Sequence, residues 1–299
     1  MKRAELAPEA APADLVPIVC CVDDRYVLPL CVLMTSLAAV PEHTALRVLL
    51  LHQDLSRTGQ ERVAFHADRL GIELEVHPVQ PARSAPVSAW VSQAVYLRLE
   101  IGDTLGPRGT VLYLDVDTLV LGDLNPLRLT PLEGAPLGAV RDPQNPVIGA
   151  GIAFPGWAEL GLPRGRDYFN SGVMLFDLAV CEQQGLFTAA RRFLTDHGDQ
   201  VRLWDQDALN FAAADQWRRL DRRWNTFALS PLATQPGYRH HDAEPYAPLA
   251  MLLADEPTAA VLHFAGPAKP WRDDYPPGRA REIYRRYLKT VEWSEFNGS

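Results

Sequence analysis

The sequence is poor in cysteine and carries no excess of positive charge. Its four cysteines, among 299 residues, form no CxxC pair and no spacing typical of a disulfide framework. Lysine and arginine number 29 against 37 aspartates and glutamates, which gives a formal net charge of −8. Such a surface does not attract nucleic-acid phosphates or anionic lipid. We therefore expect reduced cysteines, a cytoplasmic location and no nucleic-acid partner.

Long hydrophobic runs are also missing. No stretch reaches the roughly 18 uninterrupted apolar residues that a membrane helix needs, and the Ala- and Pro-rich start lacks the apolar core of a signal peptide. We expect no stable membrane insertion. The hydrophobic share of 47% is that of an ordinary globular protein. The expected organisation is a flexible leader over residues 1–14, one α/β domain over 15–275, and a C-terminal helix and tail over 276–299.

Apolar runs of strand length alternate with helical patterns near the start of the chain. The expected elements are strands over 16–22, 46–51 and 72–76 and helices over 30–40 and 58–70. Thr58 and Glu61 have the spacing of a capping box that would begin the second helix. A β-α-β-α-β order predicts parallel strands with helices on both faces, and ligands at the carboxyl ends of the strands.

The remainder of the chain continues this alternation. The expected elements are helices over 93–101, 204–214 and 279–289 and strands over 111–114, 137–140, 172–176 and 260–264. The Gly- and Pro-rich segment 141–170 has the composition of a mobile loop.

Acidic residues follow two of the expected strands. Asp23 follows the first strand, and Asp115 and Asp117 follow the strand over 111–114. Alternate residues of a strand share a face, and two carboxylates at that spacing suit Mg²⁺ or Mn²⁺. Acids that close a strand at a turn are equally a structural pattern. An EF-hand is excluded, because Val120 stands where its loop needs glycine.

The segment from Tyr113 to Thr118 also matches the hydrophobic-DxDxT signature of haloacid-dehalogenase-like phosphatases. In that family the first aspartate is a nucleophile and the second a general acid and base. Its signature normally lies on the first strand, and a later acid pair follows an apolar strand. Here Asp273 and Asp274 follow Lys-Pro-Trp-Arg instead. A phosphatase is therefore the alternative enzyme class.

The end of the last expected strand carries a further group of functional residue types. His263 closes the strand, and Gly266 and Lys269 follow it. A glycine lets backbone N–H groups approach a phosphate, and a lysine neutralises its charge. No Ser or Thr follows Lys269, so the segment is not a Walker A loop. The pattern indicates a phosphate clamp of another kind.

Six motifs taken together resemble the motif series of glycosyltransferase family 8. They are Asp23-Asp24-Arg25-Tyr26, Tyr96-Leu97-Arg98, and the segments 112–117, 169–172, 204–207 and 263–271. Their order and spacing agree with the family over about residues 16–275. The similarity is greatest to bacterial enzymes of lipopolysaccharide biosynthesis, the galactosyl- and glucosyltransferases, and extends more distantly to glycogenin.

The resemblance implies a GT-A fold, which is a Rossmann-like α/β unit with a mixed central sheet flanked by helices. It implies a retaining transfer of galactose or glucose from a UDP-sugar to a hydroxyl of a glycan or lipooligosaccharide. Asp115, Asp117 and His263 would hold Mn²⁺, or Mg²⁺, beside the diphosphate. A degenerate protein that binds the sugar nucleotide without turnover is the non-enzyme alternative.

The resemblance also implies roles for single residues around the donor. Asp23 would accept a hydrogen bond from uracil and Tyr26 would stack on it, with Arg25 replacing a common asparagine. Gly266 and Lys269 would hold the phosphates. The residues that would orient the donor sugar are Arg98, Asn170, Asp205 and Asp207.

Gln206 matches the glutamine that lies on the β face of the donor sugar in the family. An amide is a poor nucleophile, so a front-face mechanism is favoured, in which the leaving phosphate helps to deprotonate the acceptor. Asp205 and Asp207 beside it are the other catalytic candidates, and Asp142 would lie near the acceptor. The sequence ends without the basic, aromatic tail of some relatives, so only transient contact with the inner membrane face is expected.

Overall fold

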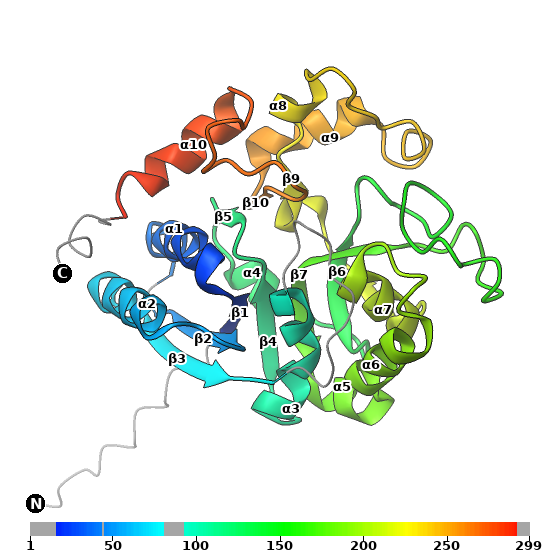
Figure 1. Cartoon of the computed structure of the whole chain (residues 1–299), viewed down its shortest axis with the longest axis horizontal. Coiled ribbons are helices and arrows are strands. Elements are labelled where there is room, and N and C mark those ends of the chain that lie inside the picture. The colour runs from blue at the N-terminus through cyan, green and yellow to red at the C-terminus, as the bar shows by residue number, and fades with distance from the viewer. Residues whose placement is uncertain (1–15, 44, 81–92, 292–299) are drawn as a thin grey trace, which may run out of the picture.

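The computed structural model describes residues 16–43, 45–80 and 93–291, so the expected leader over residues 1–14 lies outside the described part. A seven-stranded sheet has the order β3-β2-β1-β4-β7-β6-β8, and a three-stranded sheet has the order β5-β10-β9 (Figure 1). The strands are β1 (Ile18–Val22), β2 (Arg47–His52), β3 (Glu73–Pro78), β4 (Thr110–Leu114), β5 (Thr118–Val120), β6 (Leu137–Arg141), β7 (Phe169–Asp177), β8 (Trp217–Arg219), β9 (Thr226–Phe227) and β10 (Val261–His263).

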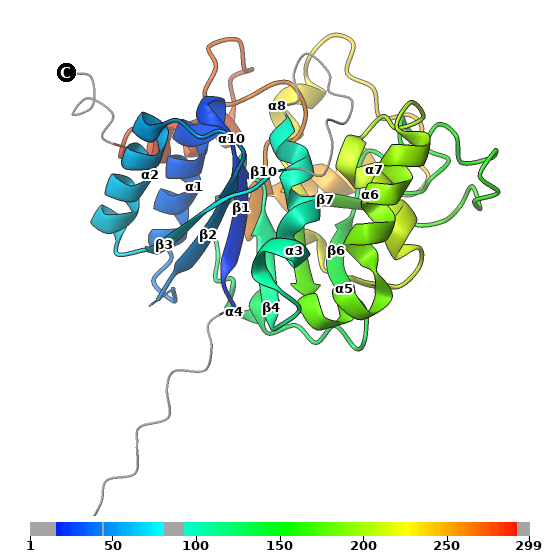
Figure 2. The ribbon, with the colours of Figure 1, turned by 60° about the horizontal axis from the view of Figure 1, so that its bottom comes forward.

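Helices cover both faces of the large sheet, with α1 and α2 on one side and α5 and α6 on the other (Figures 1 and 2). The α-helices are α1 (Val27–Ala38), α2 (Arg57–Leu70), α3 (Ile101–Leu105), α4 (Asn125–Arg128), α5 (Leu178–Gln184), α6 (Leu186–His197), α7 (Trp204–Ala213), α8 (Ser230–Ala233), α9 (Leu249–Asp255) and α10 (Arg279–Leu288). Short 3-10 helices are η1 (Asp24–Tyr26), η2 (Gln93–Glu100), η3 (Arg222–Trp224) and η4 (Glu256–Thr258).

Strand β1 shows why the early apolar runs form the centre of the sheet. Ile18, Cys20 and Val22 belong to the hydrophobic cluster under α1, whereas Val19 and Cys21 belong to the cluster under α6. A strand buried on both faces needs a continuous apolar sequence, because its side chains alternate between the faces. All four cysteines are buried and none is in a disulfide, as expected.

Strand β7 gives the large sheet its mixed character. The parallel pairs β1/β2, β2/β3 and β1/β4 follow from the expected β-α-β order, but β7 pairs antiparallel with both β4 and β6. Its first residues therefore lie beside the last residues of β4, and the Asp115 N–H donates to the Gly172 carbonyl at 2.8 Å. The mixed GT-A sheet is confirmed, and the antiparallel strand brings two distant motifs together.

The small sheet brings a third motif to the same place. Strand β5 directly follows Asp117, and β10 pairs antiparallel with it so that His263 lies opposite Thr118. The Phe264 N–H donates to the Asp117 carbonyl at 3.0 Å, just beyond this pair. The register of two short strands thus sets His263 next to Asp117.

One local expectation, the capping box at the start of the second helix, is wrong. Helix α2 begins at Arg57, and its N-cap is Ser56, whose Oγ accepts from the Gly59 N–H at 3.0 Å. Thr58 therefore lies inside the helix and forms no capping box. The helix expected over 93–101 is present, as the 3-10 helix η2 followed by α3 from Ile101.

The irregular segment between β6 and β7, expected to be a mobile loop, is anchored at its base. Val147 and Asp167 form a bridge, and Asp167 pairs with both Arg141 and Arg219. Ile152, at the far end, is 63% exposed. Within residues 16–43, 45–80 and 93–291, no helix combines the length and the apolar character needed to span a bilayer.

The capping serine gives a direct test of the corrected start of α2. Ser56→Ala removes the bond to the Gly59 N–H and the bond from Ser56 Oγ to Asp24, which measures 2.7 Å. We expect the free energy of unfolding to fall by about 1 kcal/mol. Thr58→Ala is the control and should change it by less than about 0.5 kcal/mol. Urea denaturation measures the free energy of unfolding of both variants. A larger loss of stability in Thr58→Ala than in Ser56→Ala would show that Thr58 caps the helix.

Candidate active site

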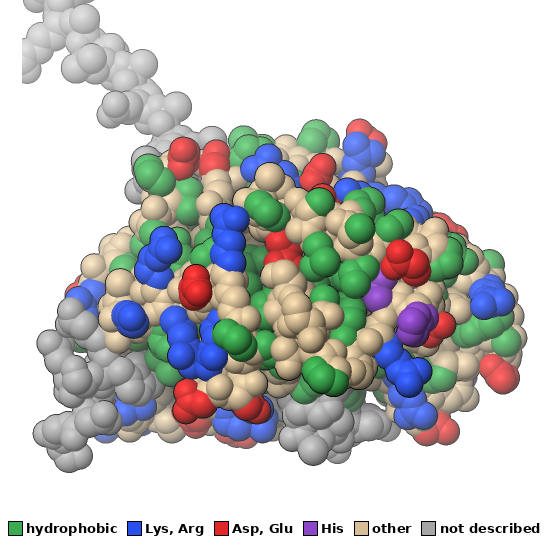
Figure 3. All heavy atoms as spheres, turned by 90° about the horizontal axis from the view of Figure 1, so that it is seen from above, with side chains coloured by type: hydrophobic (Ala, Val, Ile, Leu, Met, Phe, Trp, Pro, Cys, Tyr) green, Lys and Arg blue, Asp and Glu red, His purple; other side chains and the backbone are tan. Residues whose placement is uncertain are grey.

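A cavity of about 670 Å³ opens at the carboxyl ends of β1 and β4. Figure 3 looks onto this face of the molecule, where hydrophobic side chains and histidines border a hollow. The expected site residues that line the cavity are Asp23, Tyr26, Arg98, Asp115, Asp117, Asp142, Asn170, Asp205, Gln206, His263, Gly266 and Lys269. Residues from β1, β4, β7, α7 and β10 thus meet in one place, although they are far apart in sequence.

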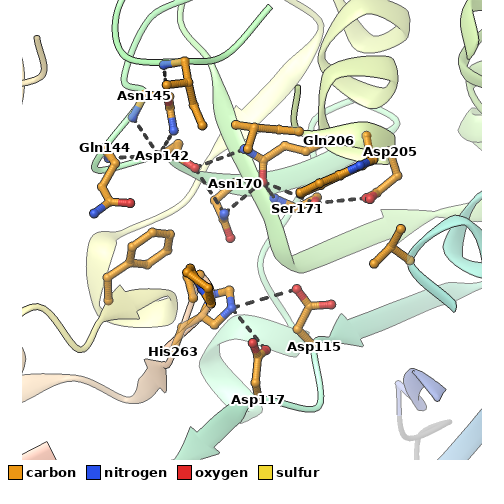
Figure 4. Close-up of a pocket in the computed structure, with 18 of the residues that line it drawn as sticks. Asp115, Asp117, Asp142, Gln144, Asn145, Asn170, Ser171, Asp205, Gln206 and His263 are labelled. Carbon is orange, nitrogen blue, oxygen red and sulfur yellow. Dashed lines mark hydrogen bonds and ion pairs between the residues drawn. The ribbon is translucent and has the colours of Figure 1, made fainter. Parts of the chain in front are cut away.

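Asp115, Asp117 and His263 form a group that could hold a metal ion. One ligand atom of each lies within 4.8 Å of the others. His263 Nε2 is 3.3 Å from Asp117 Oδ1 and 3.9 Å from Asp115 Oδ2 (Figure 4). Two carboxylate oxygens and an imidazole nitrogen suit Mn²⁺ and related divalent metals. The donor set therefore fits the metal that the sequence predicts.

The other oxygen of each aspartate is held by the protein. Asp115 Oδ1 accepts from Tyr113 Oη at 2.6 Å and from Arg98 Nη2 at 2.9 Å. Asp117 Oδ2 accepts from Lys269 Nζ at 2.5 Å. Burial alone would raise the pKa of Asp117, but Lys269 and His263 hold it well below its ordinary value. Asp117 is therefore ionised, and each aspartate turns one oxygen toward His263.

Arg98 joins the metal group to the start of α7. Its guanidinium is buried and lies 2.9 Å from Asp115 and 3.1 Å from Asp205 Oδ2. Burial raises the pKa of Asp205 to about 7, although the charge of Arg98 opposes the shift. Arg98 Nη1 also donates to the Ser171 carbonyl at 2.8 Å. Arg98 therefore positions two acids and β7 together.

Gln206, Asn170 and Asp142 form a connected polar group on the opposite wall (Figure 4). Asn170 Nδ2 donates to Gln206 Oε1 at 2.9 Å and to Asp142 Oδ2 at 3.2 Å. Gln206 Nε2 donates to the same Asp142 oxygen at 3.1 Å. Asp142 Oδ1 accepts from the N–H groups of Gln144 and Asn145. These contacts fix the orientation of each side chain without any ligand.

Asp207 does not take the place expected for it. It is absent from the residues that line the cavity, and both oxygens are used within the protein. They accept from Tyr168 Oη at 2.6 Å and from the N–H groups of Phe154, Arg202 and Leu203. The last two contacts stabilise the turn before Trp204, whose φ of 47° is rare for a residue other than glycine. Both Asp207 oxygens thus stabilise the chain around the start of α7, and a role of Asp207 in orienting the donor sugar stays a prediction.

Three further expected residues line the cavity through different contacts. Asp23 accepts from the Arg25 N–H at 3.0 Å and forms an ion pair with its guanidinium at 2.9 Å. Tyr26 packs edge-on against Trp271, with ring centroids 5.8 Å apart. Gly266 has a φ of 89°, which side chains rarely allow.

The sequence did not indicate several residues of the site. Tyr113 holds Asp115, and Asn225 holds His263 Nδ1 at 2.9 Å. A surface segment from Arg239 to Ala243 also lines the cavity. The alternation of β4 could have placed Tyr113 on the face of Asp115, two residues later. Asn225 lies in no motif, so no signal pointed to it.

The chain is similar to known proteins over most of its length. The family model described as glycosyl transferase family 8 matches residues 17–275. General stress protein A of Bacillus subtilis is 27% identical over 297 residues, covering 94% of this chain and 96% of that protein. Lipopolysaccharide 1,2-glucosyltransferase of Escherichia coli is 24% identical over 280 residues, covering 92% and 78%.

A solved structure extends the comparison to three dimensions. The galactosyltransferase LgtC, solved in complex with donor and acceptor sugar analogs, aligns with a TM-score of 0.73 and 27% identity. The alignment covers 95% of this chain and 99% of that one.

The close contact between β7 and His263 gives a first test of the site. A Cβ at Gly172 would lie 2.3 Å from His263 Cε1 and 2.8 Å from Nδ1. Gly172→Ala should displace the imidazole and weaken Mn²⁺ binding by about tenfold or more. Gly165→Ala is the control, because a Cβ there meets nothing within 4 Å. Titration of free Mn²⁺ by electron paramagnetic resonance measures both, and equal affinities would contradict the assignment.

The raised pKa of Asp205 predicts a pH effect on stability. The folded carboxyl keeps its proton up to about pH 7, whereas an unfolded one releases it near pH 4. The folded state therefore binds more protons in this window, and Asp205 contributes stability that is lost as the pH rises from about 4 to 7. Asp205→Asn cannot titrate. Urea unfolding in EDTA should show the unaltered protein losing stability relative to Asp205→Asn over that window, and parallel curves would refute this.

Proposed function

The chain belongs to glycosyltransferase family 8, and we propose that it is a metal-dependent, retaining enzyme that uses UDP-galactose or UDP-glucose. The acceptor would be a hydroxyl of a glycan or lipooligosaccharide. The observation that carries the proposal is the group of Asp115, Asp117 and His263 in the cavity, with Lys269 beside it. The three residues would hold Mn²⁺, whose charge would offset that of the diphosphate.

The charges around the metal group support a diphosphate ligand. Arg98 and Lys269 offset the carboxylates of Asp115 and Asp117. A divalent cation added to this balanced set leaves the site positive, which a bound diphosphate requires. Lys269 Nζ also donates to the Phe264 carbonyl at 2.9 Å, which keeps its charge beside the metal ligands. The overall charge of −8 is therefore no obstacle to a phosphorylated donor.

The contacts of Gln206 support a front-face mechanism. Its Oε1 already accepts from Asn170 Nδ2 and from the Ser171 N–H, both at 2.9 Å. An amide oxygen that accepts two hydrogen bonds is a poorer nucleophile than a free one. We therefore assign Gln206 to orienting the donor sugar, together with Asp205 and Asn170, while the leaving phosphate takes the acceptor proton.

The acceptor would meet the donor on the side of Asp142. The exposed Ile152 and the polar Gln144 line the cavity there, and an apolar surface beside polar groups suits a sugar. The similarity to a lipopolysaccharide glucosyltransferase favours a saccharide of that class. The four buried thiols fit a reducing compartment, so we place the enzyme in the cytoplasm, with transient contact at the inner membrane face.

The phosphatase alternative is wrong. The chain is a glycosyltransferase by family, and Asp273, the start of the acid pair that a phosphatase would need, lies on the surface beside Arg285. The remaining alternative is that the protein binds a sugar nucleotide without turnover, and an activity assay tests it.

The decisive experiment is release of UDP from UDP-galactose and UDP-glucose with and without Mn²⁺. We expect Mn²⁺-dependent release that Asp117→Asn lowers by about a hundredfold or more, because the metal loses a charged ligand. Asp196→Asn, on the outer face of α6, is the matched control and should retain full activity. Wild-type turnover in Asp117→Asn would disprove the metal site. If the unaltered protein binds UDP but shows no turnover, it is a sugar-nucleotide-binding protein and not an enzyme.

A further inference from the structure

His263 is held from behind by a buried amide. Its Nδ1 lies 2.9 Å from Asn225 Oδ1, while its Nε2 faces Asp115 and Asp117. His263 is 3% exposed and Asn225 2% exposed, so water does not compete for this contact. Asn225 comes from the short segment between η3 and β9, and it does not itself line the cavity.

A chain of hydrogen bonds fixes which way the Asn225 amide points. The Gly172 N–H donates to Asn170 Oδ1 at 2.9 Å, and a backbone N–H can only donate. Asn170 Oδ1 is thereby identified as the acceptor end of that amide, and Asn225 Nδ2 donates to it at 2.8 Å. The other end of Asn225, its Oδ1, must then face His263. An oxygen at this position can only accept, so His263 Nδ1 carries the proton.

The protonation of Nδ1 determines what the other ring nitrogen can do. A neutral imidazole with its proton on Nδ1 has a free lone pair on Nε2, which is the form that binds a metal. That lone pair is directed at the gap between Asp117 Oδ1 and Asp115 Oδ2. Removal of the residue that fixes the tautomer of a metal-binding histidine typically weakens metal binding 10- to 100-fold.

We propose that Asn225 is the positioning residue of this metal site, because it holds His263 in the tautomer and ring orientation that present Nε2 to the ion. The proposal rests on the proposed function of the site. It adds a residue that belongs to none of the motifs and that acts only through His263.

The same series of hydrogen bonds extends to the acceptor side of the cavity. Asn170, which orients Asn225, also donates through Nδ2 to Asp142 Oδ2 and Gln206 Oε1. Two side chains, Asn170 and Asn225, therefore connect Asp142 to His263, and each of these amides has only one orientation that satisfies its neighbours. Two asparagines suit this place because each must accept at one end and donate at the other.

Two substitutions separate positioning from folding. Asn225→Leu removes the acceptor for the His263 proton, and we expect Mn²⁺ to bind about 10- to 100-fold more weakly. Asn225→Asp keeps an acceptor for that proton but loses the donor to Asn170, so Mn²⁺ affinity should stay within about threefold of the unaltered protein. A residue with a merely structural role would show the same loss in both variants.

Asn210→Leu is the matched control for a buried asparagine. Its amide is 2% exposed and bonds the backbone of Phe169 and Gln206, without touching a metal ligand. The substitution should lower the free energy of unfolding but leave Mn²⁺ affinity within about threefold. Electron paramagnetic resonance of free Mn²⁺, with and without UDP, measures affinity in the full-length chain of all variants.

A second measurement tests the proposal without metal. ¹⁵N resonances of the His263 ring, identified by their loss in His263→Gln, report which nitrogen carries the proton. We expect the proton on Nδ1 in the unaltered protein and in Asn225→Asp, and a shift toward Nε2 in Asn225→Leu. A proton on Nε2 in the unaltered protein would overturn the proposal.

The outcomes also distinguish the proposal from the function on which it rests. Mn²⁺ binding that Asp117→Asn abolishes but Asn225→Leu leaves unchanged would overturn the role of Asn225 and keep the metal site. No Mn²⁺ binding by the unaltered protein, even with UDP, would overturn both. Weak binding in Asn225→Leu that Asn225→Asp restores, with Asn210→Leu unaffected, would establish Asn225 as the positioning residue.

Discussion

The antiparallel pairing of β7 with β4 is the constraint on which the site depends. It sets Asn170, Ser171 and Gly172 beside the acids that follow β4, and the Asp115 N–H bonds the Gly172 carbonyl directly. Had β7 run parallel to β4, its first residues would lie at the opposite edge of the sheet. The absence of a side chain at Gly172 then leaves room for His263, which arrives from the small sheet. One reversed strand and one missing side chain therefore bring the three parts of the site together.

Buried charge is the second organising feature. Arg98, Asp115, Asp117, Asp205 and Lys269 occupy one region, and each has an oppositely charged partner at 3.1 Å or closer. Isolated charges at such depth would cost several kcal/mol each, so removal of one partner disturbs the others. Burial raises the pKa of Asp205 against the opposing charge of Arg98, whereas Lys269 and His263 lower the pKa of Asp117 in spite of its burial. The pairing keeps the site ordered without a ligand.

The sequence predicted those features of the structure that depend on neighbouring residues alone. The apolar run of β1 and the acids after β4 could be identified because strand alternation and strand ends have clear signatures. Capping of α2 by Ser56 was missed because Thr58 fits the same rule two residues later. The contacts of Asp207 with Tyr168 and with backbone N–H groups could not be predicted, because a helix's first turn accepts an acid for several reasons. Asn225 could not be predicted, because its role exists only once β9, β10 and β7 have come together in space.

The ion pair between Lys269 and Asp117 has a consequence for the order in which ligands are loaded. Without ligands, the Lys269 ammonium donates a hydrogen bond to Asp117 Oδ2 and neutralises that carboxylate. In the proposed enzyme, a metal ion at Asp117 Oδ1 would be repelled by the ammonium on Oδ2, whereas a bound diphosphate would offer that ammonium oxygens of its own. Each ligand therefore eases the entry of the other, and by thermodynamic reciprocity the coupling is equal in both directions.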